Sequence, residues 1–184
     1  MPVLLATNLI VGEVEDSNAC NRLPTSRAAT AQVGVGQETP DDIDGKLLRV
    51  LIVESDRSTA DTLWSRIDSW GHDVRKANDG VFGLALALSF RPDVMLLDMA
   101  TPDISGLEVA LQVRRWARLK NCFIIAITSR TDKKHRCQCY EAGIDLCLTK
   151  PVIPSHLQTL LILESEYVCC RENILTDTHE FSSE

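Results

Sequence analysis

The 184 residues of this chain are 45% hydrophobic, enough to bury the core of one domain with further segments attached. A formal net charge of −7 argues against a nucleic-acid-binding surface, which would need a basic patch or stripe. No apolar run approaches the ~18 residues of a membrane span, and the apolar start of the chain lacks the cationic residues of a secretory signal. We therefore expect a cytoplasmic protein that binds neither nucleic acid nor membrane.

The seven cysteines are an odd number, and their spacing does not pair them as C-x-x-C metal ligands. Cys122 and Cys147 lie next to or within predicted strands, where a free cysteine serves as a small apolar side chain. A metal site made from His135, Cys137 and Cys139 would lack the ligand spacing that is usual for zinc. A reducing compartment is the simpler interpretation.

Residues 1–46 differ in composition from the rest of the chain. Scattered apolar residues are mixed there with Asn, Ser, Thr, Gly and Pro, acidic residues outnumber basic ones, and no period is sustained. We predict a disordered N-terminal extension over residues 1–46. A start codon assigned too far upstream would produce the same pattern, and the sequence does not separate these two explanations.

From residue 47 onward, strands and helices alternate along the chain. Strands are predicted at residues 48–53, 73–77, 94–97, 123–127 and 145–148. Helices are predicted at residues 58–70, 81–90, 107–119, 132–142 and 155–166. The last helix is expected to bury four leucines, Leu157, Leu160, Leu161 and Leu163. Residues 167–184 are predicted to form a flexible tail.

This alternation with short loops indicates a parallel sheet with helices on both faces and right-handed crossovers. For about 120 residues the expected α/β fold is flavodoxin-like, a five-stranded (βα)5 arrangement with strand order 2-1-3-4-5. That order places the ends of the first and third strands next to each other. Ligands of such sheets gather outside the carboxyl ends of the strands.

Four of the five predicted strands end in side chains that suit phosphate chemistry. In chain order these residues are Glu54, Ser55, Asp56, Asp98, Thr128 and Lys150. A single acid at a strand end is usually just solvated. Several complementary groups gathered at one edge are hard to explain by solvation alone, so we expect a functional site there.

The order and spacing of these residues resemble the receiver domain of two-component response regulators, the CheY-like family. The motifs that carry the resemblance are the acidic turn after the first strand, Leu-Leu-Asp98 with Pro102 and Gly106, Ala126-Ile127-Thr128-Ser129, and Ala142-Gly143 leading to Leu148-Thr149-Lys150-Pro151. Each motif is weak singly, but the set is specific. We assign residues 47–166 to this receiver domain.

The resemblance implies a single-domain response regulator in a two-component phosphorelay, which is not an enzyme. Asp98 would accept a phosphoryl group from a sensor histidine kinase or a histidine phosphotransfer protein, and output would be contact with a downstream protein. Mg²⁺ would be held by Glu54, Asp56, Asp98 and the backbone carbonyl of Ala100. Carboxylates serve as such nucleophiles, and the transferred group needs cations to balance its charge.

Two further roles are implied by the resemblance. Lys150 would pair with one phosphoryl oxygen, and its peptide bond to Pro151 would be cis. The Thr128 hydroxyl would bind another phosphoryl oxygen and draw the following loop inward.

Two departures from the family pattern leave an alternative open. Receivers usually carry two adjacent aspartates where this chain has Glu54 and Ser55, and a neutral hydroxyl is a poor ligand for Mg²⁺. Cys147 stands where relatives usually have an aromatic residue. The alternative is a pseudo-receiver binding module with weak or no Mg²⁺-dependent phosphorylation. An FMN protein of the same fold is disfavoured, because acids rather than a phosphate-binding loop follow the first strand.

Overall fold

The computed structural model describes residues 46–177, with side chains described as far as residue 171. The extension predicted for residues 1–46 therefore lies outside the described residues except for its last position. No helix within residues 46–177 combines the length and apolar character needed to cross a bilayer.

A five-stranded parallel sheet forms the centre of the domain. Its strands are β1 (Arg49–Val53), β2 (Asp73–Ala77), β3 (Val94–Asp98), β4 (Phe123–Thr128) and β5 (Leu146–Thr149). The helical elements are α2 (Arg57–Ser69), α3 (Gly80–Phe90), α4 (Gly106–Arg115), the 3-10 turn η1 (Ala117–Leu119), α5 (Lys133–Glu141) and α6 (Pro154–Asp177). The strand order is β2-β1-β3-β4-β5, which confirms the predicted fold.

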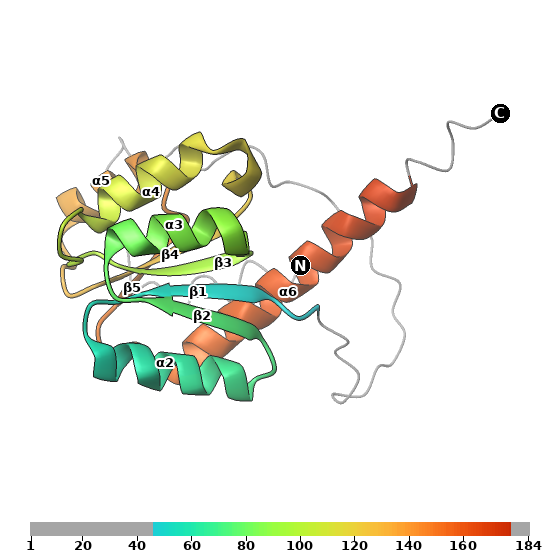
Figure 1. Ribbon diagram of the computed structural model, residues 1–184, viewed down its shortest axis with the longest axis horizontal. Helices are drawn as coiled ribbons and strands as arrows, with labels where there is room; N and C mark the ends of the chain where they lie inside the picture. The colour runs from blue at the N-terminus through green and yellow to red at the C-terminus, as the bar shows by residue number, and fades with distance from the viewer. Residues whose placement is uncertain (1–45, 178–184) are drawn as a thin grey trace. The chain divides into compact units, whose positions relative to one another are not determined.

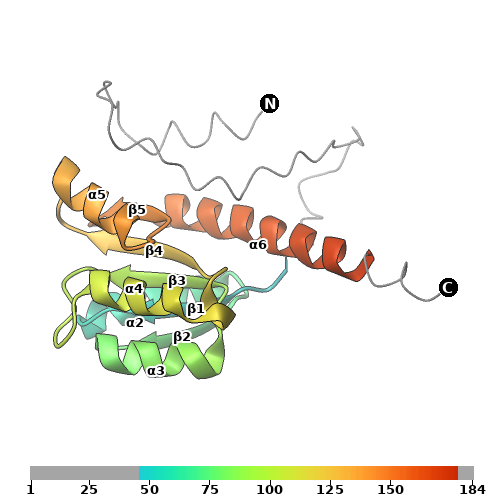
Figure 2. The ribbon, with the colours of Figure 1, turned by 90° about the horizontal axis from the view of Figure 1, so that it is seen from above.

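The helices form two layers, one on each face of the sheet. Helices α3, α4 and α5 cover one face, and α2 and α6 cover the other (Figure 1). Figures 1 and 2 also show that α6 runs past the edge at which the strands begin. The central strand β3 is buried along its whole length, as a parallel strand covered on both faces should be.

The strand register brings distant polar residues to one edge of the sheet. Val53 of β1 pairs with Leu97 of β3, so Glu54 and Asp98 follow side by side. On the other side of β3, Thr128 of β4 pairs with Thr149 of β5, and Lys150 follows directly. The apolar strands thus hold the polar strand ends at the carboxyl edge.

Short polar side chains start four of the helices. The caps Asp56, Asp79, Ser105 and Asp132 each accept a hydrogen bond from the backbone N–H three residues later. This is the usual way to satisfy an N–H group that has no partner in the first helical turn. One of these caps, Asp56, was predicted to serve the functional site instead.

The helix predicted over residues 107–119 is interrupted at Trp116. Trp116 has an extended backbone, with φ −88° and ψ 115°, between α4 and η1. Its N–H still bonds to the carbonyl of Val113. The sequence contains no Gly or Pro at this point, so the break gave no signal.

The last helix, α6, continues to Asp177, so the predicted helix end at residue 166 is wrong and the helix extends into residues that were predicted as a tail. No Gly or Pro stops the helix, and the buried face continues with Val168. Leu163 was expected to be buried but is 41% exposed. Glu164 and Ser165 occupy the buried face instead, so apolar character alone misplaced the face.

Candidate functional site

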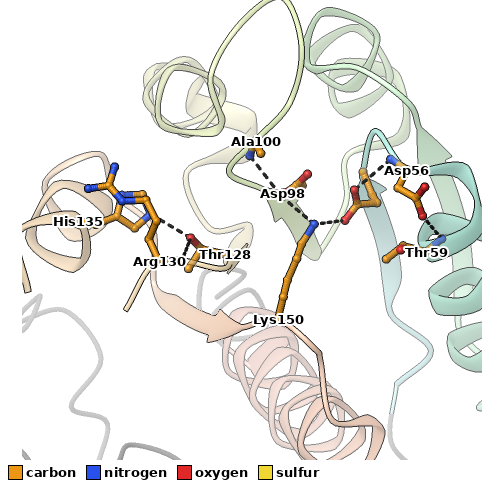
Figure 3. A network of polar contacts seen from close by, with 9 residues as sticks. Asp56, Thr59, Asp98, Ala100, Thr128, Arg130, His135 and Lys150 are labelled. Carbon is orange, nitrogen blue, oxygen red and sulfur yellow. Dashed lines mark hydrogen bonds and ion pairs between the residues drawn. The ribbon is translucent and has the colours of Figure 1, made fainter. Parts of the chain in front are cut away.

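Three side chains from the ends of three strands meet at the carboxyl edge of the sheet (Figure 3). The ammonium Nζ of Lys150 lies 2.9 Å from Oε2 of Glu54 and 3.1 Å from Oδ1 of Asp98. Both acids are buried, with 1% and 2% of their surface exposed. The structure therefore brings Glu54, Asp98 and Lys150 together, as the strand order requires.

The charges at this edge depend on one another. Burial alone would lower the pKa of Lys150, but its hydrogen bonds and charge interactions with Glu54 and Asp98 outweigh burial and raise the pKa. Lys150 is therefore cationic at neutral pH. Buried carboxylates are costly unless they are paired, and here two carboxylates share one ammonium group.

The two oxygens of Asp98 are in different environments. Oδ1 accepts a hydrogen bond from the N–H of Ala100 at 3.2 Å and faces Lys150. Within residues 46–171, Oδ2 accepts no hydrogen bond. A carboxylate oxygen without a protein partner keeps its lone pairs available for a metal ion or for nucleophilic attack.

Asp56 was predicted as a metal ligand, but its carboxylate does not join this group. Oδ1 accepts a hydrogen bond from the N–H of Thr59 at 2.7 Å, and the side chain points toward α2 (Figure 3). The hydrogen bonding to Thr59 lowers the pKa of Asp56. Only its backbone N–H contacts the site, by donating to Oε1 of Glu54 at 3.1 Å.

Fewer carboxylates meet at this edge than were predicted to bind the metal ion. Across the described part of the chain, no three or more His, Cys, Asp or Glu side chains are grouped to hold a metal ion. The two acids at the edge, Glu54 and Asp98, are nevertheless suitable ligands for Mg²⁺, which commonly binds one or two carboxylates and keeps several waters. The free Oδ2 of Asp98 makes the donor set chemically compatible with a weakly held Mg²⁺.

Thr128 lies at the end of β4 but faces away from Lys150 (Figure 3). Its hydroxyl lies 3.2 Å from Nε2 of His135 on α5 and accepts a hydrogen bond from the N–H of Arg130 at 3.0 Å. His135 is 4% exposed, and its Nδ1 has no hydrogen-bond partner in the described part of the chain. The threonine is thus held by α5.

The contact with His135 was not predicted. His135 and Cys139 are one helical turn apart and are the buried residues of α5, and Sγ of Cys139 lies 3.8 Å from Nε2. That spacing was the available signal, but the sequence analysis considered His135 only as a metal ligand. The neighbouring thiol of Cys139 and burial together raise the pKa of Cys147.

The turn after β5 has the predicted conformation. The peptide bond between Lys150 and Pro151 is cis. The N–H of Lys150 donates to the carbonyl of Thr128 at 2.8 Å, so β4 supports the turn from which the lysine side chain reaches across the edge.

Comparisons with known proteins agree with this geometry. Residues 50–162 match the family model of the response regulator receiver domain. The chain is 32% identical over 103 residues to the DNA-binding dual master transcriptional regulator RpaA of Synechocystis, covering 56% of this chain and 43% of RpaA. It is 35% identical over 104 residues to the response regulator MprA of Mycobacterium avium, covering 56% of this chain and 45% of MprA. The chain thus spans less than half the length of these relatives.

Solved structures of similar fold cover most of the described domain. The chemotaxis protein CheY4 of Vibrio cholerae superposes with a TM-score of 0.61 and 28% identity, covering 63% of this chain and 97% of CheY4. The receiver domain of the sensor histidine kinase PA1611 of Pseudomonas aeruginosa, which has a magnesium ion coordinated in its active-site cleft, gives a TM-score of 0.61 and 25% identity, covering 66% of this chain and 99% of that domain.

Proposed function

The chain belongs to the response regulator receiver domain family, and on this basis we propose that it accepts a phosphoryl group on Asp98 in a two-component phosphorelay. The donor is a phosphohistidine on a sensor histidine kinase or on a histidine phosphotransfer protein. The domain then signals in the cytoplasm by contact with a downstream protein, and it acts as a switch rather than as an enzyme. The observation that carries this proposal is the oxygen Oδ2 of Asp98, which accepts no hydrogen bond from residues 46–171 although the carboxylate lies beside the cationic Lys150.

The chemistry follows from that arrangement. Oδ2 attacks the phosphorus, and a P–O bond forms as the P–N bond to the partner's histidine breaks. Charge on the transferring group is spread over its three equatorial oxygens, so catalysis depends mainly on positioning and on nearby cations. Lys150 already lies 3.1 Å from Asp98 and supplies one of these cations.

Magnesium would be held by Asp98, Glu54 and the backbone carbonyl of Ala100. When bound, it neutralises charge on the transferring phosphoryl group. Ser55 offers only a neutral oxygen, and the ammonium of Lys150 is bound to the same two acids. We therefore propose that Mg²⁺ binds more weakly here than at a site with a third carboxylate.

Thr128 is proposed to report the phosphorylated state. We propose that its hydroxyl turns from Nε2 of His135 to donate to a phosphoryl oxygen. That exchange creates a hydrogen bond to a charged acceptor, which is a strong kind. The phosphoryl group thereby competes with α5 for Thr128, and the loop between them changes position.

Incubation with acetyl phosphate and Mg²⁺, followed by intact-mass measurement, tests the proposal. The wild type should gain the mass of one phosphoryl group, and Asp98→Asn should gain none. Asp103→Asn is a matched control, since it removes an exposed acid from the same loop. An unmodified wild type at saturating Mg²⁺, or equal modification of Asp98→Asn, contradicts the proposal.

A second function, a binding module with little or no phosphorylation, is favoured by one observation. Asp56 caps α2 and leaves the site with two carboxylates that Lys150 already neutralises in part. Titration with Mg²⁺, followed by tryptophan fluorescence, separates the two functions. Saturable binding supports the phosphorylated switch, and the absence of any response up to high concentration supports the binding module.

A further inference from the structure

A small polar pocket lies at the opposite edge of the sheet, where the strands begin. Its volume is about 220 Å³. Four arginines from four separate parts of the chain line it together with one acid: Arg49, Arg91, Arg118, Arg171 and Asp93. The last turns of α6 reach this pocket because α6 continues past the edge of the sheet (Figures 1 and 2).

The acid in the pocket is fully used by one of the arginines. Oδ2 of Asp93 accepts hydrogen bonds from the N–H of Arg49 at 2.9 Å and from its Nε at 3.1 Å, and Oδ1 accepts one from Nη2 at 2.8 Å. Burial would raise the pKa of Asp93, but these bonds and the charge of Arg49 outweigh it and lower the pKa. Asp93 therefore stays charged and neutralises Arg49.

The other three arginines have no such partner. Within residues 46–171, the guanidinium groups of Arg91, Arg118 and Arg171 make no ion pair or hydrogen bond. Cys122 also lines the pocket, but burial raises the pKa of its thiol to about 12, so it adds no negative charge. Glu164 is buried near Cys122 but does not line the pocket. Positive charge is thus concentrated at one place in a chain whose net charge is −7.

The backbone at Arg91 adds to this argument. Arg91 ends α3 in a left-handed conformation, with φ 51°. Glycine is the usual residue at such a position, because other side chains adopt this conformation at a cost. An arginine here therefore needs an explanation other than local backbone geometry.

We propose that this pocket binds a phosphate group, either as a free inorganic anion or as the phosphate end of a small metabolite. A phosphate carries more than one charge and presents oxygens in several directions, which suits guanidinium groups that arrive from separate elements. A single carboxylate is planar, carries one charge and is satisfied by one guanidinium fork, as Asp93 shows. A volume of about 220 Å³ is below that of ordinary small-molecule sites, so the pocket is too small to enclose a whole nucleotide.

Calorimetric titration of the full chain with inorganic phosphate, pyrophosphate and glycerol phosphate tests this site. A chelator keeps Mg²⁺ away from Asp98 and Lys150 at the other edge. The wild type should bind the phosphate compounds at one saturable site. Acetate serves as the carboxylate control and should not bind. Tighter binding of glycerol phosphate than of inorganic phosphate assigns the ligand to the metabolite class, and the reverse order assigns it to the free anion.

Two variants and two controls identify the residues. Arg118→Gln combined with Arg171→Gln should weaken binding about a hundredfold, at about tenfold for each charged hydrogen bond. Arg91→Gly fits the left-handed backbone and should weaken it about tenfold without disturbing the fold. Arg66→Gln combined with Arg136→Gln removes the same charge outside the pocket and should leave binding unchanged. Lys150→Gln should also leave phosphate binding unchanged.

Several results overturn the proposal. These are the absence of saturable binding to the wild type, unchanged binding by Arg91→Gly, equal weakening by the control pair, and loss of binding in Lys150→Gln alone. The last result would place the phosphate at the opposite edge of the sheet. Binding of acetate as tight as that of phosphate would overturn the ligand class.

Discussion

Two aspartates at the two ends of one strand have opposite surroundings. Asp93 precedes β3 and is 9% exposed, and Asp98 ends β3 and is 2% exposed. Arg49 donates hydrogen bonds to both oxygens of Asp93, whereas both contacts of Asp98 are made by Oδ1. Burial is similar, so what separates the structural acid Asp93 from Asp98, the proposed phosphoryl acceptor, is whether both carboxylate oxygens accept hydrogen bonds.

The difference arises from the cation that each acid meets. Arginine presents a planar fork that matches both oxygens of a carboxylate, and Arg49 does this for Asp93. Lysine is a compact charge on a flexible stem, and Lys150 divides its ammonium group between Glu54 and Asp98. A shared ammonium group can follow a change of charge on Asp98, while a bidentate pair is fixed.

Truncation of each aspartate gives the largest expected difference between the two edges. Asp93→Ala leaves the charge of Arg49 without its carboxylate and removes three hydrogen bonds, so the free energy of unfolding should fall by about 3 kcal/mol. Asp98→Ala leaves Lys150 paired with Glu54 and should change it by less than about 1 kcal/mol. Urea denaturation followed by circular dichroism measures both.

A double-mutant cycle with Arg49→Ala assigns the loss to the pair. The coupling between Arg49 and Asp93 should account for most of the loss in Asp93→Ala. If Asp98→Ala is as destabilising as Asp93→Ala, the distinction between a fixed and a shared cation does not hold.

Most residues of the carboxyl edge could be predicted from the sequence, but the orientation of their side chains could not. Alternation of strands and helices predicts a parallel sheet, and the flavodoxin-like order expected for this length places Asp98 next to the end of β1 and Lys150 on the same edge. Asp56 was predicted as a metal ligand and caps α2 in the structure, because a short acid at the end of a strand and before a helix suits either a metal site or an N-cap. The sequence pattern does not say which N–H group will take the carboxylate.

The contact between Thr128 and His135 depended on information that the pattern lacks. Helix α5 is mostly polar, so no apolar stripe defines which side faces the sheet.

The ion pair between Arg49 and Asp93 also gave no signal in the sequence, because the two residues are separated by 44 residues along the chain. They become neighbours only when β1 and β3 are paired in register, with Val50 opposite Val94.

Adding an acid beside Glu54 should make the carboxyl edge of the sheet less stable without Mg²⁺ and more dependent on it. Ser55→Asp raises the number of carboxylates that compete for Lys150, so the metal-free protein should lose stability through like-charge repulsion. The same change should tighten Mg²⁺ binding by about tenfold or more, because Mg²⁺ prefers charged oxygen. Calorimetric titration with Mg²⁺ measures the affinity, and thermal melting with and without Mg²⁺ measures the stability.

Asp56→Asn serves as the comparison for that variant. Asparagine also caps helices, so this change should preserve α2 and alter Mg²⁺ affinity only slightly. A loss of Mg²⁺ binding as large as the gain in Ser55→Asp would show that Asp56 is a ligand after all.

The smallest expected effect is a change in how stability depends on alkaline pH. The pKa of Lys150 is raised above its ordinary value of 10.5 by Glu54 and Asp98 against the effect of burial. A group whose pKa is raised by folding contributes stability that is complete below its unfolded pKa and is lost as pH rises through the folded pKa. Asp98→Asn removes one of the two acids that raise this pKa, so the loss should be smaller and should be complete at lower pH than in the wild type. The measurement is the difference between the melting temperatures of the two proteins from about pH 9 to pH 12. The other lysines and the tyrosines titrate in both proteins, so their contribution cancels in this difference. Parallel curves would mean that Asp98 does not hold the proton on Lys150, and that Glu54 alone sets the charge of the edge.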